Sequence, residues 1–234
     1  MIFLNTSLIR KLTLFLAAAM LSVSAIAADF NQVQREANQG DAVAQSNLGV
    51  KYYNGEGVRQ DYAKAKEWYE KAANQGVAES QYNLGLMYNN GEGVRQDYAK
   101  AKEWYEKAAN QGVAAAQSNL GVNYYNGEGV RQDYAKAKEW YEKAANQGVA
   151  ESQYNLGLMY NNANGVSQDY SKAREWYLKA ANQGHADAQY NLGVMYYQGQ
   201  GVRQNTASAK EWFGKACDNG AQNGCDEYRK LNQR

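Results

Sequence analysis

The chain of 234 residues contains no proline, only one histidine and only two cysteines. The absence of proline fits an array of elements without a linker or a long loop. The single histidine, His185, lacks the partners that a metal site or a general base would need. No long apolar run follows residue 26, so we expect the rest of the chain to be soluble and to contain no membrane-spanning helix.

Residues 1–27 have the three parts of a secretory signal peptide. Two basic residues, Arg10 and Lys11, precede an apolar run that ends at Ile26, and small residues favour cleavage after Ala27. The apolar run is too short for a comfortable membrane span of about 20 residues. No cysteine follows the cleavage site, so no lipid anchor is available there. We therefore expect a periplasmic or secreted protein, with no stable membrane insertion after cleavage.

The composition of the mature chain argues against a nucleic-acid partner. Cleavage removes Arg10 and Lys11, which leaves 23 basic and 24 acidic groups. A protein that binds nucleic acid by neutralising phosphates needs an excess of positive charge, and this chain has none. The one conspicuous excess is tyrosine, with 20 residues against 4 phenylalanines.

A period of 36 residues dominates the mature sequence. The stretch "GEGVRQDYAKAKEWYEKAANQG" occurs without change at 55–76, 91–112 and 127–148. A copied segment cannot easily reserve one copy for a unique catalytic site, so the period predicts a repeat architecture. The expected division is a capping half-repeat at 28–40, repeats at 41–76, 77–112, 113–148, 149–184 and 185–220, and a C-terminal capping helix at 221–234.

Each repeat is predicted to form two helices. In the second repeat, Gly91 and Gly112 suit the left-handed residue that closes a helix, and Asp97 suits an N-cap. Small residues such as Gly49 let the helices approach closely, while Trp68 fills the gap between one repeat and the next. The predicted fold is an all-α, right-handed α-solenoid (superhelix) of antiparallel helix pairs with 36-residue repeats, stabilised between neighbours.

These motifs resemble the Sel1-like repeat, a relative of the tetratricopeptide repeat. The shared pattern is "NLG", a tyrosine three residues after its glycine, "GEGV", an aspartate three residues later, and "KAKEWYEKAANQG". The resemblance covers essentially the whole mature chain and points to an exported bacterial type. It implies a solenoid whose first helices line a concave face and which assembles or recognises other proteins. The fourth repeat departs from it at Ala163 and Asn164, which leaves the local conformation of that turn open.

Two motifs that could carry chemistry have simpler interpretations. "GEGVRQ" begins like a dinucleotide-binding loop, but the third glycine is missing, no strand precedes it, and the motif recurs. His185 stands where other repeats have aspartate or valine, at the start of a first helix. We interpret the glycines as turn residues and His185 as a helix-start residue, and we expect no catalytic residue, no cofactor and no metal.

Cys217 and Cys225 replace an alanine and a glutamine of the other repeats. The first would close a second helix and the other would open the capping helix, so the turn between them would bring the two together. In an exported protein this placement predicts a disulfide, with two free thiols as the alternative. Their spacing also resembles that of cysteine-rich Sel1-like proteins.

Some of those cysteine-rich relatives are described as binding or hydrolysing β-lactams. The alternative function is therefore a cell-wall-related enzyme, or a binder of β-lactam or peptidoglycan. A serine acylase of that kind needs Ser-x-x-Lys, and no serine of the mature chain has a lysine three residues later. We favour a non-enzymatic scaffold, a monomer, that binds a protein or peptide partner.

The first helices differ from repeat to repeat along one helical stripe. Repeats one and three match each other there, as do two and four, so the pattern returns every 72 residues. The aliphatic members, such as Val50 and Leu86, suit packing between first helices. Tyrosines and asparagines suit a wet recognition surface. The predicted partner-binding residues are Tyr53, Tyr82, Asn89, Tyr125, Tyr154, Asn161, Tyr190 and Tyr197.

Overall fold

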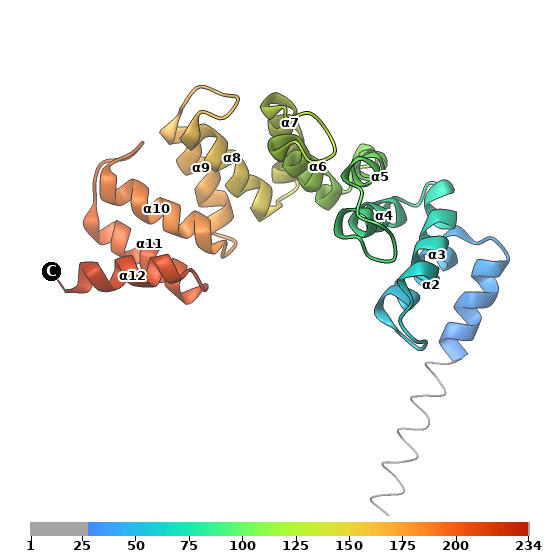
Figure 1. The fold of residues 1–234 in the computed structure, drawn as a ribbon. Helices are drawn as coiled ribbons and strands as arrows, with labels where there is room; N and C mark the ends of the chain where they lie inside the picture. The colour runs from blue at the N-terminus through green and yellow to red at the C-terminus, as the bar shows by residue number, and fades with distance from the viewer. Residues whose placement is uncertain (1–27, 234) are drawn as a thin grey trace, which may run out of the picture. The chain divides into compact units, whose positions relative to one another are not determined.

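The computed structural model describes residues 28–233, and all regular structure within this range is helical (Figure 1). The predicted signal peptide lies outside the described residues. Among the described helices, none has both the length and the apolar character needed to cross a bilayer. The chain divides into two compact units, of which the first ends at Asp97 and the second begins at Tyr98.

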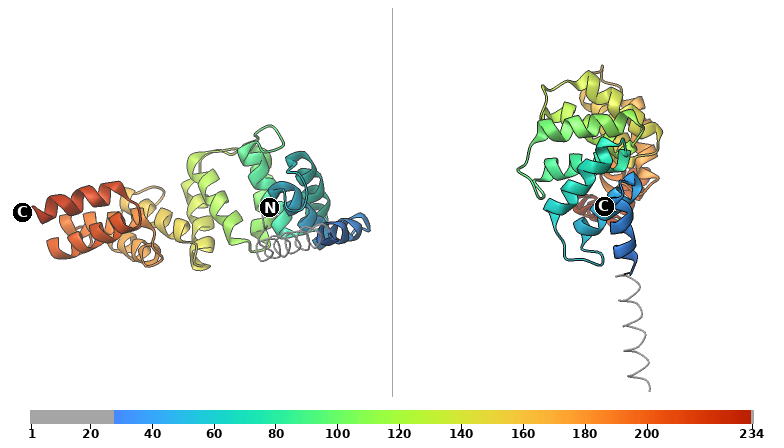
Figure 2. Two further views of the ribbon diagram at one scale, coloured as in Figure 1. Left: turned by 90° about the horizontal axis from the view of Figure 1, so that it is seen from below. Right: turned by 90° about the vertical axis from the view of Figure 1, so that its right-hand side faces the viewer.

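The first unit contains a helix at 28–38, then α2 (Ala42–Asn54), α3 (Tyr62–Asn74) and α4 (Ala78–Asn90). The second unit contains α5 (Tyr98–Asn110), α6 (Ala114–Asn126), α7 (Tyr134–Asn146), α8 (Ala150–Asn162), α9 (Tyr170–Ala181), α10 (Ala186–Gln198), α11 (Thr206–Asp218) and α12 (Gln222–Asn232). Within each unit, consecutive helices pack together, as α6 with α7 and α8 with α9 (Figures 1 and 2). The prediction of an all-α solenoid of helix pairs with a 36-residue period is confirmed. The even-numbered helices from α2 to α10 are the first helices of the repeats. The odd-numbered helices from α3 to α11 are the second helices.

The helix ends follow from the turn residues. The glycines that close the first helices adopt the left-handed conformation, as at Gly91 with a φ of 76°. Gly112, after a second helix, also has a positive φ of 92°, so both expectations are confirmed. The second helices begin at side chains that accept a backbone N–H three residues ahead: Asp61, Asp133, Asp169 and Asn205. Each such cap satisfies a donor that the first turn of a helix leaves unpaired.

In α2, α6, α8 and α10, a glycine lies directly against an aromatic ring of the second helix of the same repeat. A Cβ at Gly49 would lie 2.5 Å from the Tyr69 ring, and one at Gly193 would lie 2.5 Å from the Phe213 ring. Tyr69 and Phe213 are each only 2% exposed. A side chain in place of the glycine would force the two helices apart, since a packed interior has no room to absorb it. The predicted close approach at Gly49 is confirmed.

The tryptophans of the second unit join neighbouring repeats, as predicted. Trp140 and Trp176, from consecutive second helices, pack against one buried cluster that includes Leu156 and Met159. Each indole also lies under a lysine, with the Lys143 ammonium 3.8 Å from the centre of the Trp140 ring. The tryptophan rings are therefore partly buried between repeats, with a lysine ammonium over the face of each ring.

In repeats two to five, the second glycine of the turn lies directly against the start of the second helix of the preceding repeat. A Cβ at Gly93 would lie 2.7 Å from the carbonyl carbon of Tyr62, which begins the second helix of the preceding repeat. Gly201 approaches Tyr170 in the same way, at 2.6 Å. The glycines of "GEGVRQ" are therefore turn and docking residues, which supports the simpler interpretation of that motif.

A buried glutamine joins each first helix to the second helix that precedes it. Its side-chain amide donates to the carbonyl of an alanine eight residues earlier, as from Gln45 to Ala37 at 3.1 Å and from Gln153 to Ala145 at 3.0 Å. The same bond is made by Gln81, Gln117 and Gln189. Each of these carbonyls also accepts the backbone N–H of the glycine three residues later, so the glutamine amide adds a second donor at the end of the preceding helix.

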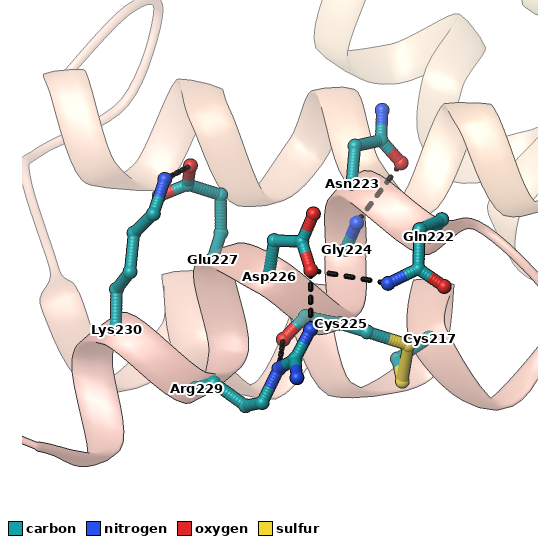
Figure 3. Close-up of polar contacts among 9 residues, drawn as sticks. All are labelled: Cys217, Gln222, Asn223, Gly224, Cys225, Asp226, Glu227, Arg229 and Lys230. Carbon is teal, nitrogen blue, oxygen red and sulfur yellow. Dashed lines mark hydrogen bonds and ion pairs between the residues drawn. A yellow bond between two sulfur atoms is a disulfide. The ribbon is translucent and has the colours of Figure 1, made fainter.

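At the last junction a disulfide stands in place of this hydrogen bond (Figure 3). Cys217 occupies the alanine position and Cys225 the glutamine position, and the bridge joins the end of α11 to the start of α12 with a Cα–Cα distance of 4.5 Å. Disulfide pairing is confirmed over two free thiols. In α12, Arg229 takes the place of the "NLG" glycine and pairs with Asp226, so this helix has no gap for another aromatic ring.

The turn of the fourth repeat keeps the conformation of the others although its glycine is missing. Ala163 has a φ of 59° and a ψ of 31°, and it is the one non-glycine residue with positive φ among those described. An alanine in this region is strained, because its Cβ crowds the following carbonyl. The sequence left the conformation of this turn open, and the structure shows that it is a strained copy of the turn in the other repeats.

Replacing both cysteines should show that the disulfide and the glutamine hydrogen bond have the same structural role, which is to hold a helix to the one before it. The disulfide closes a short loop and should contribute about 2–3 kcal/mol to the free energy of unfolding. We expect C217S/C225S to lose this stability and to expose the amides of α12 to hydrogen exchange. C217A/C225Q, which rebuilds the pair found at the other junctions, should recover about 1 kcal/mol. Equal exchange in α12 for the two variants would contradict the equivalence.

Relieving the strain at Ala163 should stabilise the second unit. Glycine adopts the left-handed conformation without the Cβ penalty, so A163G should raise the free energy of unfolding by about 1 kcal/mol in a urea titration. Gly127 closes α6 in the same way, with a φ of 79°, and provides the matched control. G127A should lower stability by a similar amount, and two changes of the same sign would refute the explanation.

Candidate functional site

The predicted partner-binding residues all lie on first helices and are all half-buried. Three belong to the first unit, namely Tyr53, Tyr82 and Asn89. The other five belong to the second unit, namely Tyr125, Tyr154, Asn161, Tyr190 and Tyr197. None of the eight side chains is fully exposed, so each combines a packing contact with a surface that a partner could reach.

Tyr53 reaches from the end of α2 to the turn of the next repeat. Its hydroxyl donates to the Glu92 carboxylate at 2.5 Å, and its ring meets the edge of the Tyr62 ring at 5.1 Å. The hydrogen bond to Glu92, and then burial, raise the pKa of the Tyr53 phenol to about 12. The tyrosine therefore ties two repeats together while its outer edge stays accessible.

Tyr125 makes the corresponding contact in the second unit with the opposite polarity. The amide of Asn164, which stands where the second repeat has Glu92, donates to the Tyr125 hydroxyl at 2.6 Å. The ring again lies 5.1 Å from its neighbour, here Tyr134. Because the Tyr125 oxygen is the acceptor, its own O–H group remains available to donate.

Tyr154 belongs to a polar cluster between repeats four and five. Its ring stacks on His185 with 4.5 Å between centroids, and His185 Nε2 lies 3.0 Å from the Glu151 carboxylate. His185 Nδ1 accepts the backbone N–H of Ala188 at 3.3 Å, so the histidine is the N-cap of α10, as predicted. This bond assigns the proton of a neutral imidazole to Nε2, which then donates to Glu151. The bond lowers the pKa of the Glu151 carboxyl.

The remaining predicted residues sit close to structural contacts of their own helices. The Tyr190 ring lies 5.5 Å from Phe213, the aromatic partner of Gly193. The backbone carbonyls of Asn89, Asn161 and Tyr197 each accept a glutamine side chain from the following turn, at 2.7, 2.8 and 2.7 Å. These bonds fix the backbone and leave the asparagine amides at the surface of α4 and α8 half-exposed.

The 72-residue alternation also includes buried serine pairs, whereas the sequence prediction assigned packing between first helices only to its aliphatic members. Ser46 and Ser80 pair their buried hydroxyls at 2.8 Å, and Ser118 and Ser152 do so at 2.9 Å. At the junction of repeats four and five, the larger Tyr154 stands at the position of Ser46. The recurrence of the two serine pairs 72 residues apart was the available signal. Alternating residues therefore match each first helix to its neighbour, as well as shaping its outer surface.

Among the described residues, no group of three or more histidine, cysteine, aspartate or glutamate side chains could hold a metal ion. The candidate site is thus a set of half-buried aromatic, amide and carboxylate groups on rigid helices. Such groups can pack against, hydrogen-bond to and pair with a macromolecular surface.

The comparison with protein-family models finds the Sel1 repeat at residues 42–77, 78–113, 114–149, 150–185 and 186–220. These matches coincide with the helix pairs of the structure, and each begins one residue after the start expected from the sequence. The comparison with curated proteins finds no match.

Among solved structures, the chain is similar to c5321, a protective antigen of uropathogenic Escherichia coli strains, with 42% identity and a TM-score of 0.84. The alignment covers 86% of this chain and 43% of that antigen, so the chain spans less than half of the antigen's length. A Sel1 repeat protein from Oxalobacter formigenes is 30% identical with a TM-score of 0.81, over 92% of this chain and 85% of the other. A sel1 repeat protein from Klebsiella pneumoniae is 28% identical with a TM-score of 0.53, over 87% of this chain and 99% of the other.

The two tyrosine contacts should differ in strength because only one involves a charge. Removing the hydroxyl with Y53F eliminates a hydrogen bond to a carboxylate and should cost about 1–2 kcal/mol, discounted for exposure. Y125F removes a neutral bond and should cost less than about 1 kcal/mol. Thermal unfolding of the two variants measures the difference, and a larger loss for Y125F would contradict it.

The loss of stability caused by Y53F should also depend on pH. The pKa of the Tyr53 phenol is higher in the folded chain than in the unfolded chain, where it is about 10. The contribution of the phenol to the free energy of unfolding is therefore complete below a pH of about 10. It should disappear as the pH rises through about 12, where the folded phenol ionises. A deficit that stayed constant across this range would show that the Glu92 bond is not its source.

Proposed function

The chain belongs to the Sel1 repeat family, and we propose on this premise that it is an exported, non-enzymatic scaffold. It binds a protein or peptide partner along the first-helix faces of its repeats. Five repeats of a family whose members generally serve as protein-interaction scaffolds support this function. The eight half-buried tyrosines and asparagines on the first helices are the proposed contacts.

The observation that carries the proposal is that the two helices of a repeat differ in sequence variation and in the burial of their tyrosines. The second helices are near copies, and the second tyrosine of each copy is buried together with alanines beside it, for example Tyr141 and Ala144. The first helices carry the differences, and the tyrosines at the varying positions, such as Tyr82 and Tyr154, are partly exposed. Partly exposed tyrosines on rigid elements present large contact areas with little loss of side-chain entropy on binding.

Export is supported by two independent features. Residues 1–27 carry the pattern of a cleaved secretory signal. The Cys217–Cys225 disulfide fits an oxidising compartment, since thiols in the cytosol are kept reduced. We propose a periplasmic or secreted location, and a monomer whose partner is another protein.

Site-specific photo-crosslinking tests which helix face meets the partner. A photoreactive residue placed at Asn89, Asn161 or Tyr197 should give covalent adducts with a protein of the periplasmic or culture fraction. The matched positions are Glu67, Glu103 and Glu139, exposed on second helices of the same array. We expect adducts from the first-helix positions alone, and adducts mainly from the glutamate positions would place the recognition surface on the second helices.

A further inference from the structure

The second helices of the first three repeats carry the same ion pair. In each of them a lysine ammonium meets a glutamate carboxylate one turn later on the same helix. The pairs are Lys66–Glu70 at 2.7 Å, Lys102–Glu106 at 2.9 Å and Lys138–Glu142 at 2.6 Å. Each of these lysines is therefore neutralised within its own repeat.

The fourth repeat changes both members of this pair. Arg174 stands where the earlier repeats have lysine, and Leu178 stands where they have glutamate. Leu178 packs against the buried cluster formed by α9 and α10, and it carries no charge that could neutralise the guanidinium. In the part of the chain that the structure describes, no carboxylate pairs with Arg174.

An earlier copy of the same junction shows where a carboxylate fits. The Tyr124 hydroxyl of α6 donates to Oε1 of Glu106 in α5 at 3.4 Å, and the same oxygen pairs with Lys102. The carboxylate thus binds both a cation of the second helix and a tyrosine of the following first helix. Helices α5 and α6 belong to the second unit, as do α9 and α10.

Between α9 and α10, which pack against each other, the cation and the tyrosine meet without a carboxylate (Figure 1). Arg174 Nη2 donates to the Tyr196 hydroxyl oxygen at 3.4 Å, and the guanidinium carbon lies 5.9 Å from the centre of the Tyr196 ring. Tyr196 corresponds to Tyr124, 72 residues earlier. Its oxygen is the acceptor in this bond, so its O–H group remains available to donate.

The guanidinium of Arg174 is incompletely hydrogen-bonded. Its Nε–H group is buried and has no partner among the described residues. No hydrogen bond within the described chain reaches Nη1, which is not buried. A buried donor without a partner costs stability, and native structures rarely contain one. The free chain therefore holds a cation and a hydroxyl in the arrangement of the earlier copy and lacks only their acceptor.

We propose that Arg174 and Tyr196 bind a carboxylate supplied from outside the chain, as an aspartate or glutamate side chain of the protein partner. This site rests on the scaffold function proposed above and adds one contact to the first-helix residues. The carboxylate takes the place that Glu106 occupies in the earlier copy, and it accepts from the Nη groups and from the tyrosine hydroxyl. Arginine suits this role better than lysine, because its planar fork binds both oxygens of a carboxylate.

This combination occurs at one repeat of the array. The fifth repeat also lacks the glutamate, with Gly214 at that position, but it keeps a lysine. That residue, Lys210, lies 5.7 Å from the Tyr228 ring of α12. Asn232 stands in α12 at the position of Tyr196, so the tyrosine hydroxyl is missing there. A carboxylate bound at Arg174 would therefore fix the position of a partner along an array of near copies.

NMR titration of the mature chain tests the site without knowledge of the partner. The probe is a short peptide that alternates glutamate with serine, and a matched probe has glutamine in place of every glutamate. The glutamate probe should shift the Arg174 Nε–H resonance in a saturable way, and R174K identifies this resonance by its loss. The glutamine probe should leave it unchanged. Propionate at the same carboxylate concentration should give a smaller shift, and an equal shift would overturn the assignment to a protein side chain.

Two substitutions at position 178 separate the effect of the carboxylate from the loss of leucine. L178E rebuilds the internal pair of the first three repeats and should weaken the glutamate probe by about tenfold or more. L178Q removes the same leucine without adding a charge and should bind within about twofold of the unmodified chain. The first three repeats carry glutamate here, so the fold should tolerate both changes, which far-ultraviolet circular dichroism checks.

The control for net charge is S167E, which adds one negative charge at an exposed position of the turn before α9. A general electrostatic repulsion of the acidic probe would affect S167E and L178E alike. We expect S167E to bind the glutamate probe like the unmodified chain. Equal weakening by S167E and L178E would overturn the proposal.

The same chemistry should be transferable to the third repeat. K138R/E142L replaces the ion pair of α7 by the arginine and leucine of α9, and Tyr160 stands there at the position of Tyr196. We expect a second arginine Nε–H resonance that shifts with the glutamate probe. K138R alone keeps Glu142 as an internal partner and should show no such shift. Absence of the second response in K138R/E142L would overturn the assignment to these residues.

The carboxylate site and the scaffold function can fail separately. No response of Arg174 to the glutamate probe, an equal response to the glutamine probe, or equal affinities of L178E and L178Q would each overturn the site. If photo-crosslinking from Asn89, Asn161 or Tyr197 still captured a partner, the scaffold function would stand. If crosslinking failed while probe binding depended on Arg174, the first-helix contacts would be wrong and the carboxylate site would stand.

Discussion

The structure depends on the contact between a glycine of the first helix and an aromatic ring of the second. With no Cβ at Gly121 or Gly157, the Tyr141 and Tyr177 rings lie where a side chain would otherwise stand. This contact fixes the distance between the helices of a pair, and it buries the second-helix tyrosine almost completely. Packing therefore constrains the sequence of the second helix, and the residues that differ between the first four repeats lie mainly on the first helix.

Much of this arrangement could be predicted from local signals. The period gave the repeats, glycine and aspartate gave the helix ends, and the replacement of Ala and Gln by Cys217 and Cys225 gave the disulfide. These features involve residues close together in sequence or repeated at a fixed interval. The conformation of Ala163 could not be predicted, because the strain of one left-handed alanine is outweighed by the packing of the two helices that it joins.

The candidate site was less predictable for a physical reason. The bonds from Tyr53 to Glu92 and from Asn164 to Tyr125 join side chains 39 residues apart. Whether such groups meet depends on the offset of one repeat from the next, which is set by the close approach of Gly93 and Gly165 to the preceding helix. The sequence identified tyrosines that differ between copies, but it could not separate their packing contacts from their exposed surfaces.

The paired serines bear on how such an array changes during evolution. Ser46 meets Ser80, and Ser118 meets Ser152, so odd-numbered repeats are matched to the even-numbered repeats that follow them. Recombination that removed residues 77–148 would bring Ser46 opposite Ser152 and restore a hydroxyl pair. Loss of a single repeat would bring Ser46 opposite Ala116 and leave that hydroxyl without its partner. Selection on buried polar groups would therefore favour genes that gain or lose these repeats two at a time.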